Sequence, residues 1–214
     1  MFGDINVESP LHYLHKLSSH FTDGRANDLF NGDAEYAVVI KEKLGCAFLN
    51  LRGSASDKLF CAKVANVIGI ELPSEPGYYH SNADSCIYWL GPDEWLLSSA
   101  SRDACDLEKQ LRLDMAGHFS IVDISGGYSS INLRGVSHAV HSLLKKSSVY
   151  DCAGWPDASP SIGRCTQTTF AKASAVISNK SDGSYEIVVR RSYADYIGRW
   201  LLDAGKEFGC RIES

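Results

Sequence analysis

Short runs of apolar residues, separated by turn residues, dominate the chain from about residue 35 onward. Residues 36–40 and 46–51 are two such runs, and the polar stretch between them is typical of a turn. Residues 86–90 and 95–98 form a second pair around Gly91-Pro92-Asp93-Glu94, which predicts a hairpin. The pattern therefore predicts two pairs of strands, with a helix and a linker of turn residues between them.

The second half of the chain repeats this order. Gly126-Gly127 is a predicted turn between two strands, and a proline-bearing loop over residues 152–163 leads into a hairpin. The predicted strands of this half are residues 119–124, 129–133, 168–177 and 185–190.

Apolar residues at helical spacing predict four helices. Three of them begin at a serine, and Ser54 with Asp57 resembles a capping box, in which a side chain accepts from a free backbone N–H. Glycine or lysine follows the last turn of each helix, as helix ends favour. The predicted starts are Ser54, Ser101, Val136 and Ser192, and the predicted ends are Gly69, Gly117, Lys145-Lys146 and Gly209.

A short repeat supports a duplication. Asn-Leu-Arg-Gly occurs at residues 50–53 and at residues 132–135, each time between a strand and a helix. We therefore predict an α+β fold of two related β-β-α-β-β-α units, residues 35–118 and 119–214, packed as one body. Residues 1–34 precede them as an irregular N-terminal arm that either wraps a partner or frays.

The repeated Arg-Gly pairs, Arg52-Gly53 and Arg134-Gly135, have two interpretations. In the structural one, which we favour, glycine permits a tight strand-to-helix turn and arginine holds the helix start or a neighbouring carboxylate. In the functional one, the helix N-terminus and the arginine form an anion site.

Composition excludes several classes of protein. The 214 residues are 44% hydrophobic and 22% charged, as in an ordinary globular protein. The net charge is −5 and the longest runs of basic residues are pairs, which argues against a nucleic-acid surface. No apolar stretch approaches the roughly 20 residues of a membrane span, and no signal peptide begins the chain, so we expect a cytoplasmic protein. Seven widely spaced cysteines predict free, mostly buried thiols rather than disulfides or zinc ligands.

Signals for an independent active site are weak, and we predict no catalytic, cofactor-binding or metal-binding residue in this chain. The sequence has no glycine-rich dinucleotide loop, Walker loop or nucleophile elbow. His12 with His15, and His138 with His141, have the spacing of metal ligands on a helix, but no nearby carboxylate or cysteine completes either pair.

Other candidates have ordinary structural interpretations. Asp93-Glu94 has the chemistry of an acid/base pair, but its place in a tight hairpin favours an exposed turn. Asp123 beside Ser125 has the pattern of a turn at the end of a strand, and the alternative is that its carboxylate contacts a pteridine. Tryptophans are large enough to line a cleft. We expect Trp89 and Trp200 in the core and Trp95 and Trp155 at an interface.

Six segments, in order along nearly the whole chain, resemble the gamma subunit family of heterotetrameric sarcosine oxidase. Two of them are long and specific, Trp89-Leu90-Gly91-Pro92-Asp93-Glu94-Trp95-Leu96-Leu97 and Val189-Arg190-Arg191-Ser192-Tyr193-Ala194-Asp195-Tyr196. The others are Ser9-Pro10-Leu11, Leu49-Asn50-Leu51-Arg52-Gly53, Val122-Asp123-Ile124-Ser125-Gly126 and Gly163-Arg164-Cys165-Thr166-Gln167-Thr168.

The resemblance implies a fold similar to the folate-binding domain of aminomethyltransferases. It also implies a complex with alpha, beta and delta subunits, in which the alpha and beta subunits hold FAD, FMN and NAD and delta holds zinc. Such a complex oxidatively demethylates sarcosine to glycine and passes the methylene unit to tetrahydrofolate. The gamma subunit is then a non-catalytic structural partner. The alternative is a stand-alone folate-binding protein or methylene transferase.

Overall fold

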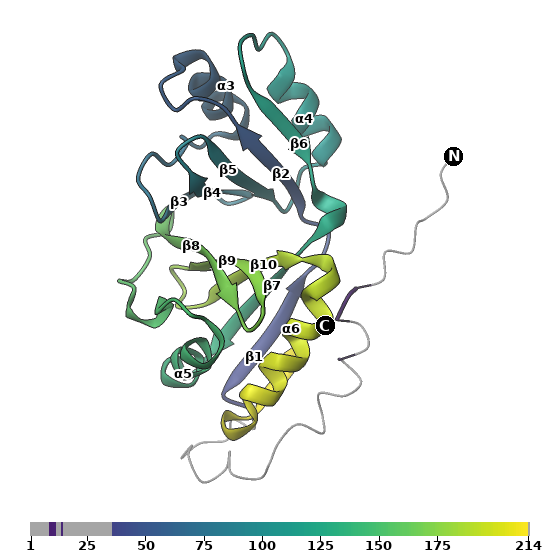
Figure 1. Ribbon diagram of the computed structural model, residues 1–214, viewed down its shortest axis with the longest axis vertical. Helices are drawn as coiled ribbons and strands as arrows, with labels where there is room; N and C mark the ends of the chain where they lie inside the picture. The colour runs from purple at the N-terminus through teal and green to yellow at the C-terminus, as the bar shows by residue number, and fades with distance from the viewer. Residues whose placement is uncertain (1–8, 12–13, 15–35, 214) are drawn as a thin grey trace, which may run out of the picture.

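Eleven strands, joined edge to edge, run through the described part of the chain. The structure is a computed structural model that describes residues 9–11, 14 and 36–213 (Figure 1). The strands are β1 (Val38–Lys43), β2 (Ala47–Arg52), β3 (Tyr78–Ser81), β4 (Ser85–Gly91), β5 (Glu94–Ser99), β6 (Ser120–Asp123), β7 (Tyr128–Gly135), β8 (Ile162–Phe170), β9 (Ala173–Asn179), β10 (Tyr185–Arg190) and β11 (Cys210–Glu213). The helices are α3 (Lys58–Ile68), α4 (Ala104–Arg112), α5 (Ser137–Ser147) and α6 (Arg191–Ala204), with 3-10 turns η2 (Ser125–Gly127), η3 (Cys152–Gly154) and η4 (Lys206–Phe208).

The strands form two sheets that are joined through β8. The order is β11-β1-β7-β10-β9-β8-β3-β4-β5-β2-β6, and every neighbouring pair in it is antiparallel except β1 with β11. The start of β8 pairs with β3, whereas residues 165–170 pair with β9. We call β3-β4-β5-β2-β6 the first sheet and β11-β1-β7-β10-β9-β8 the second sheet.

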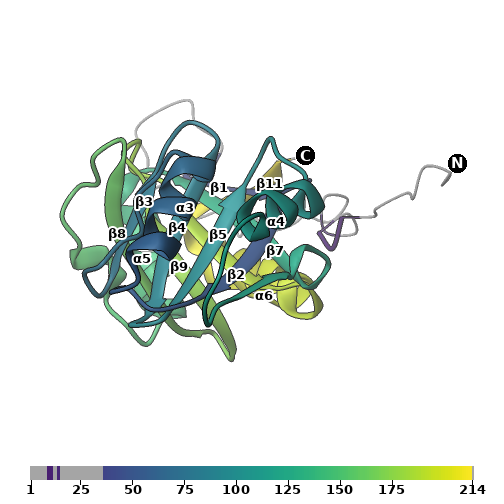
Figure 2. The same cartoon turned by 90° about the horizontal axis from the view of Figure 1, so that it is seen from above.

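Helices cover the outer face of each sheet, and the inner faces meet each other. Figure 1 shows α3 and α4 beyond the first sheet and α5 and α6 beyond the second, and Figure 2 shows α3 and α4 lying over the first sheet from above. Successive side chains of β5 point to opposite faces of the sheet, which explains this arrangement. Trp95 and Leu97 pack in the α3/α4 core, whereas Leu96 packs in the core between the sheets. The result is a four-layer helix, sheet, sheet, helix arrangement.

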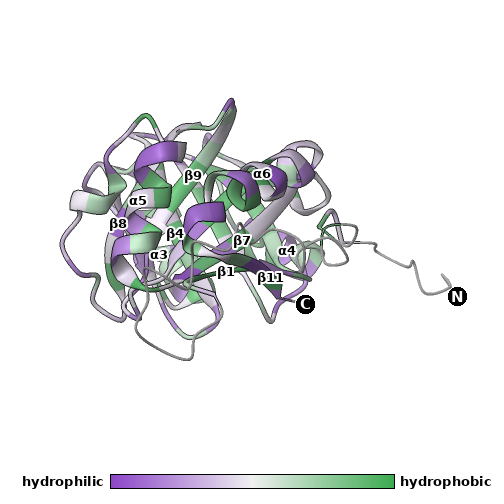
Figure 3. Cartoon of the chain, turned by 90° about the horizontal axis from the view of Figure 1, so that it is seen from below, coloured by the Kyte–Doolittle hydropathy of each residue, from purple (hydrophilic) through white to green (hydrophobic). Residues whose placement is uncertain are grey.

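The helices are amphipathic, as predicted. Figure 3 shows hydrophobic strand residues beneath α5 and α6, whose outer turns carry hydrophilic residues. The start of α3 differs from the prediction, since the N-cap is Asp57, whose carboxylate accepts from the N–H groups of Leu59 and Phe60. Asp103 rather than Ser101 caps α4, which ends at Arg112, before the predicted Gly117.

Three strand predictions need correction. The strand predicted over 168–177 is wrong, because the chain reverses at Ala171 (φ 52°) and divides this stretch between β8 and β9. The strand β3 lies within the predicted linker over 73–85. Residues after the predicted stop at Gly209 form β11, which pairs with β1.

The two halves of the chain have the same order of elements, but they are interlocked. The order β1-β2-α3-β3-β4-β5-α4 is followed by β6-β7-α5-β8-β9-β10-α6, so each of these runs has one strand more than the predicted unit, and β11 follows as a further strand of the second half. The first strand of each half lies in the sheet of the other, since β1 pairs with β7 and β6 pairs with β2. Boundaries at 35–118 and 119–214 therefore divide both sheets.

Four residues of the predicted N-terminal arm are described, Ser9, Pro10, Leu11 and Leu14, and the two leucines pack in the second sheet's core. Leu11 and Leu14 are fully buried, and a Cβ added at Gly198 of α6 would lie 2.8 and 2.6 Å from them. The hydroxyl of Ser9 donates to the carboxylate of Glu42. The remaining residues of the arm, including His12 and His15, lie outside the described residues.

No helix of the described residues is long and apolar enough to cross a membrane. All seven cysteines are free thiols, which confirms the prediction that they form no disulfide, and four of them are buried.

Trp95 is fully buried in the α3/α4 core and its ring N–H donates to the carbonyl oxygen of Pro73 at 2.9 Å. The prediction of an interface position for Trp95 is therefore wrong.

Candidate functional site

The most conspicuous polar feature is a buried charged cluster between the two sheets. We call it the inter-sheet cluster and define it as Lys43, Tyr88, Ser130, Lys180 and Glu186. The alternation of side chains along β10 places the carboxylate in this cluster. Tyr185, Ile187 and Val189 pack in the α5/α6 core, which leaves Glu186 on the face that meets the first sheet. Glu186 is 5% exposed.

Both carboxylate oxygens of Glu186 are fully used. One oxygen accepts from the Ser130 hydroxyl at 2.6 Å and from Nζ of Lys43 at 3.2 Å. The other accepts from Nζ of Lys180 at 2.7 Å and from the Tyr88 hydroxyl at 3.0 Å. The cluster joins β1, β7 and β10 of the second sheet to β4 of the first, so it fixes how the two sheets face each other.

Electrostatics hold the cluster in its charged form. Burial alone would raise the pKa of Glu186, but Lys180, Lys43 and the hydrogen bonds outweigh it and lower this pKa from 4.5 to about 2. Burial would likewise lower the pKa of Lys180, but the neighbouring Cys86 and Glu186 raise it above its ordinary value. Nζ of Lys180 also lies 4.5 Å from the ring centroid of Tyr79. The cluster is therefore a charge-paired network at neutral pH.

A cavity of about 240 Å³ opens beside the cluster. Its lining includes Lys43, Lys180 and Glu186 and several serine hydroxyls, of which Ser85 and Ser99 bond each other at 3.1 Å. Burial raises the pKa of the neighbouring Cys86 thiol to about 11. A thiol with this pKa is protonated at neutral pH and is a poor nucleophile.

The two Arg-Gly pairs have structural roles. Arg52 pairs with Glu94 at 2.7 Å and Arg134 pairs with Glu213 at 2.6 Å. A Cβ at Gly135 would lie 2.0 Å from the carbonyl oxygen of Ala37, and a Cβ at Gly53 would lie 2.8 Å from the Phe60 ring. Each arginine thus binds a neighbouring carboxylate, and each glycine permits close packing, as the structural interpretation predicts.

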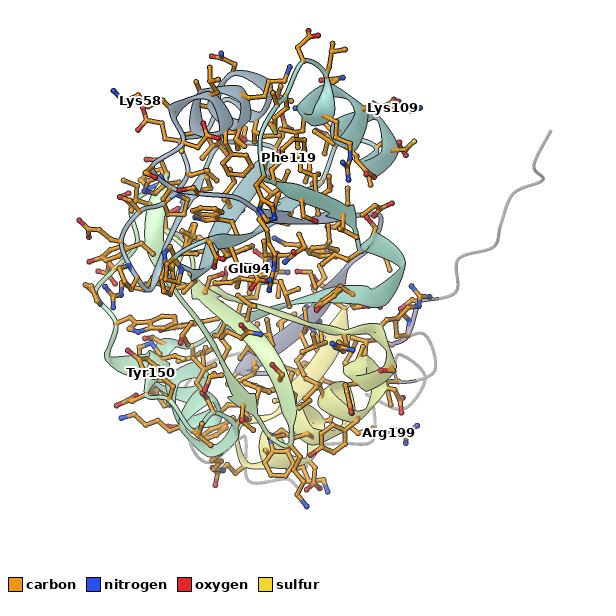
Figure 4. The ribbon with its side chains drawn as sticks, turned by 45° about the horizontal axis from the view of Figure 1, so that its top comes forward. Lys58, Glu94, Lys109, Phe119, Tyr150 and Arg199 are labelled. Atoms are coloured by element: carbon orange, nitrogen blue, oxygen red, sulfur yellow. The ribbon has the colours of Figure 1, made fainter. Side chains whose placement is uncertain are left out.

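The acidic candidates have local partners. Glu94 accepts from Asn50 and Arg52, both at 2.7 Å, whereas Asp93 is exposed in the turn between β4 and β5. Figure 4 shows Glu94 between the half that carries α3 and α4 and the half that carries α5 and α6. Asp123 accepts from the N–H and hydroxyl of Ser125 at 2.8 and 2.6 Å, which is a strand-end turn.

The histidine pair of α5 is not part of a metal cluster. Among the described residues, no group of three His, Cys, Asp or Glu side chains has the arrangement of metal ligands. His141 lies 3.4 Å from the Tyr185 hydroxyl and makes an edge-on contact with its ring. His138 also has an interaction partner.

The other tryptophans lie at the edges of the helix-covered cores. Trp89 packs against the α3/α4 core and Trp200 against the α5/α6 core, where its ring N–H donates to Ser147 at 3.0 Å. Trp155 stacks on Tyr185 with 6.4 Å between ring centroids, and its buried ring N–H has no partner among the described residues.

Sequence reasoning missed the inter-sheet cluster. One signal was present, because Glu186 is a lone carboxylate inside an apolar strand, where an unpaired charge would be strongly unfavourable. Lys180 and Ser130 gave no such signal, since a lysine near a turn and a serine in a strand are common. Their proximity to Glu186 depends on the pairing of β7 with β10 and on the β9–β10 turn.

Comparison with known proteins places these features in context. Residues 52–207 match the family described as "Sarcosine oxidase, gamma subunit family". The sarcosine oxidase subunit gamma of Corynebacterium sp. (strain U-96) is 28% identical over 178 residues, which cover 81% of this chain and 82% of that one. The same subunit of Arthrobacter sp. is 27% identical over 188 residues, covering 86% and 87%.

Solved structures share the fold. A chain of the heterotetrameric sarcosine oxidase from Corynebacterium sp. U-96, in complex with pyrrole 2-carboxylate, superimposes with a TM-score of 0.75 at 24% identity, covering 97% of this chain and 98% of that one. The glycine cleavage system aminomethyltransferase T of Bartonella henselae has a TM-score of 0.55 at 10% identity, covering 95% of this chain and 58% of that one.

Proposed function

Since the chain belongs to the sarcosine oxidase gamma subunit family, we propose that it is a non-catalytic structural subunit of a heterotetrameric sarcosine oxidase complex. The complex oxidatively demethylates sarcosine to glycine and transfers the methylene unit to tetrahydrofolate. The observation that carries the proposal is the family match, which runs from the end of β2 into η4 and takes in both sheets.

The chemistry of the buried groups supports a non-catalytic role. A general base for neutral pH needs a pKa near 7, whereas the pKa of Glu186 is about 2 and that of Lys180 is raised above its ordinary value. Burial raises the pKa of the Cys165 and Cys210 thiols to about 12, which keeps them protonated. Proton transfer and thiolate attack are therefore unfavourable at these groups.

We assign the cofactors and the reaction to the partner subunits. FAD, FMN, NAD and zinc belong to the alpha, beta and delta subunits, tetrahydrofolate binds outside this chain, and the complex works in the cytoplasm. The role of this chain is then to provide binding surfaces for those partner subunits.

The two halves are, on this proposal, products of a duplication. Their shared order of seven elements and the repeat of Asn-Leu-Arg-Gly at the ends of β2 and β7 support it. The arginine of each repeat pairs with a glutamate, at 2.7 Å for Arg52 and 2.6 Å for Arg134. The exchange of β1 and β6 makes the two units one body rather than two domains.

Affinity purification of the tagged chain from its native host tests the proposal. We expect larger flavin-containing subunits to co-purify in fixed proportion and the sample to oxidise sarcosine. Purification of the chain alone, or with proteins unrelated to amine oxidation, would contradict the proposed function.

The aminomethyltransferase-like fold favours a second candidate, a stand-alone folate-binding protein or methylene transferase. Titration of the purified chain with tetrahydrofolate separates the two candidates. Saturable heat release or fluorescence quenching in the isolated chain would support folate binding, and no change at millimolar tetrahydrofolate would remove this candidate.

A further inference from the structure

Two depressions on the surface meet at Arg190, at the junction of β10 and α6. One is an open groove of about 600 Å³, and the other is a cavity of about 140 Å³ between the sheets. Arg190 lines both, and we call the two depressions together the Arg190 surface. It is defined by Pro10, Asn50, Glu94, Gly126, Gln167 and Arg190.

The Arg190 surface is locally positive on a chain whose net charge is −5. Among the residues that the structure describes, the groove is lined by Arg190 and Arg191 and by no carboxylate, and the adjoining cavity is lined by Glu94, which already pairs with Arg52. The side chain of Arg190 is exposed and has no ion pair or hydrogen bond with any described residue. An unpaired arginine fork is suited to bind a carboxylate through two parallel hydrogen bonds.

The surroundings of Arg190 have the composition of a protein interface. A Cβ added at Gly126 or Gly127 would have nothing within 4 Å, so the 3-10 turn presents open backbone to the groove. Val122, which is 45% exposed, lies opposite Asn50 in the pairing of β6 with β2. Arginine, aromatic and apolar side chains beside a polar rim are typical of binding surfaces, and Tyr128 supplies the aromatic ring.

The family-like segments of the sequence converge on the same surface. Each of the six segments contributes at least one lining residue, although they span residues 9 to 196. The cavity beside the inter-sheet cluster is lined by residues outside all six segments. The six segments that carry the resemblance thus meet at this surface, and none of them lines the cavity beside the inter-sheet cluster.

We propose that the Arg190 surface binds an acidic segment of another subunit, with a carboxylate of that segment paired to Arg190. The inference rests on the proposed function, which supplies the partner subunit. It adds the place of contact and the charge of the segment that docks there.

Charge reversal at Arg190 in the co-expressed complex tests the inference. We expect Arg190→Glu to reduce retention of the partner on the tagged chain by about tenfold or more at roughly 0.15 M salt, because it replaces attraction by repulsion. The matched control is Lys58→Glu, which makes the same charge change on exposed α3, far from α6 in Figure 4, and leaves retention unchanged. Thermal unfolding of both variants checks that they fold.

Retention of the partner by R190E at the wild-type level would overturn the inference and leave the proposed function intact. A wild-type chain that retains no partner would overturn both.

A second variant identifies the occupant of the surface. R190K keeps the positive charge and introduces an amine, which a carbodiimide links covalently to a paired carboxylate. Peptide mass spectrometry of the cross-linked complex is expected to identify an Asp or Glu of the partner. A link to Asp4 or Glu8 of this chain would overturn the inference and assign the surface to its own N-terminal segment.

Discussion

At the residue scale, Glu186 is a buried carboxylate held by four side chains. Two lysines, a tyrosine and a serine surround its carboxylate, and the hydrogen bond from the tyrosine joins the two sheets. A buried ion pair is weak evidence for stability by itself, because removing both charges from water is unfavourable. Its value lies in specificity, since only one alignment of the sheets brings all five side chains together.

The substitution Glu186→Gln leaves Lys180 buried without its counter-charge. We expect it to lower the free energy of unfolding by about 3 kcal/mol, within the range for breaking one side of a buried pair. The matched control is Glu213→Gln, whose 28% exposed carboxylate also contacts lysine and arginine, and which should change stability by about 1 kcal/mol or less. Urea unfolding followed by tryptophan fluorescence measures both, and equal effects would contradict a special role for Glu186.

Acid should weaken the same pair. The pKa of Glu186 is about 2 in the folded chain and 4.5 ordinarily, so its stabilising contribution is complete above pH 4.5 and is lost as the pH falls toward 2. The urea midpoint of the wild-type chain should fall over this window more steeply than that of E186Q. Parallel curves for the two proteins would show that Glu186 is not responsible for the acid sensitivity.

At the element scale, local patterns in the sequence predicted most helices and hairpins but not their boundaries. The stripe Phe60, Val64 and Ile68 is buried as its spacing indicates. The β8–β9 turn was missed because Ala171-Lys172 has no turn signal, and Ala171 adopts a left-handed φ of 52° that alanine rarely takes. The short edge strand β11 exists only because β1 is beside it, and a partner distant in sequence leaves no local signal.

The N-cap of α3 is not the Ser54 that the sequence analysis predicted. Asp57 caps the helix, whereas the Ser54 hydroxyl contacts Ser56 in the preceding loop. Asp57→Ala should therefore lower stability by about 1 kcal/mol, and Ser54→Ala by about half of that or less. Chemical denaturation measures the difference, and a larger effect at Ser54 would restore the capping box that the sequence suggested.

At the scale of the whole molecule, the exchange of first strands joins the two halves. A sequence pattern can indicate that two units repeat, but the sheet to which β1 belongs is decided by tertiary pairing with β7. The packing of the two sheets likewise brings the six family-like segments to one surface. Sequence reasoning identified those segments, and only the folded chain places them side by side.

Interlocked halves should unfold together. We expect one cooperative transition, with the same midpoint by far-ultraviolet circular dichroism and by tryptophan fluorescence, because Trp95 and Trp200 report on different helix-covered cores. Fragments 35–118 and 119–214 should each fail to fold, since each lacks a strand of its own sheet. Two separate transitions would contradict the interlocked arrangement.

We propose that this chain contributes structure rather than chemistry to a sarcosine-oxidising complex. The most direct test is the rate of sarcosine oxidation per flavin, measured for the remaining subunits expressed with and without this chain. We expect its omission to leave the other subunits incompletely assembled and nearly inactive, and its addition to restore the rate. Full activity of the remaining subunits in its absence would show that this structural role is wrong.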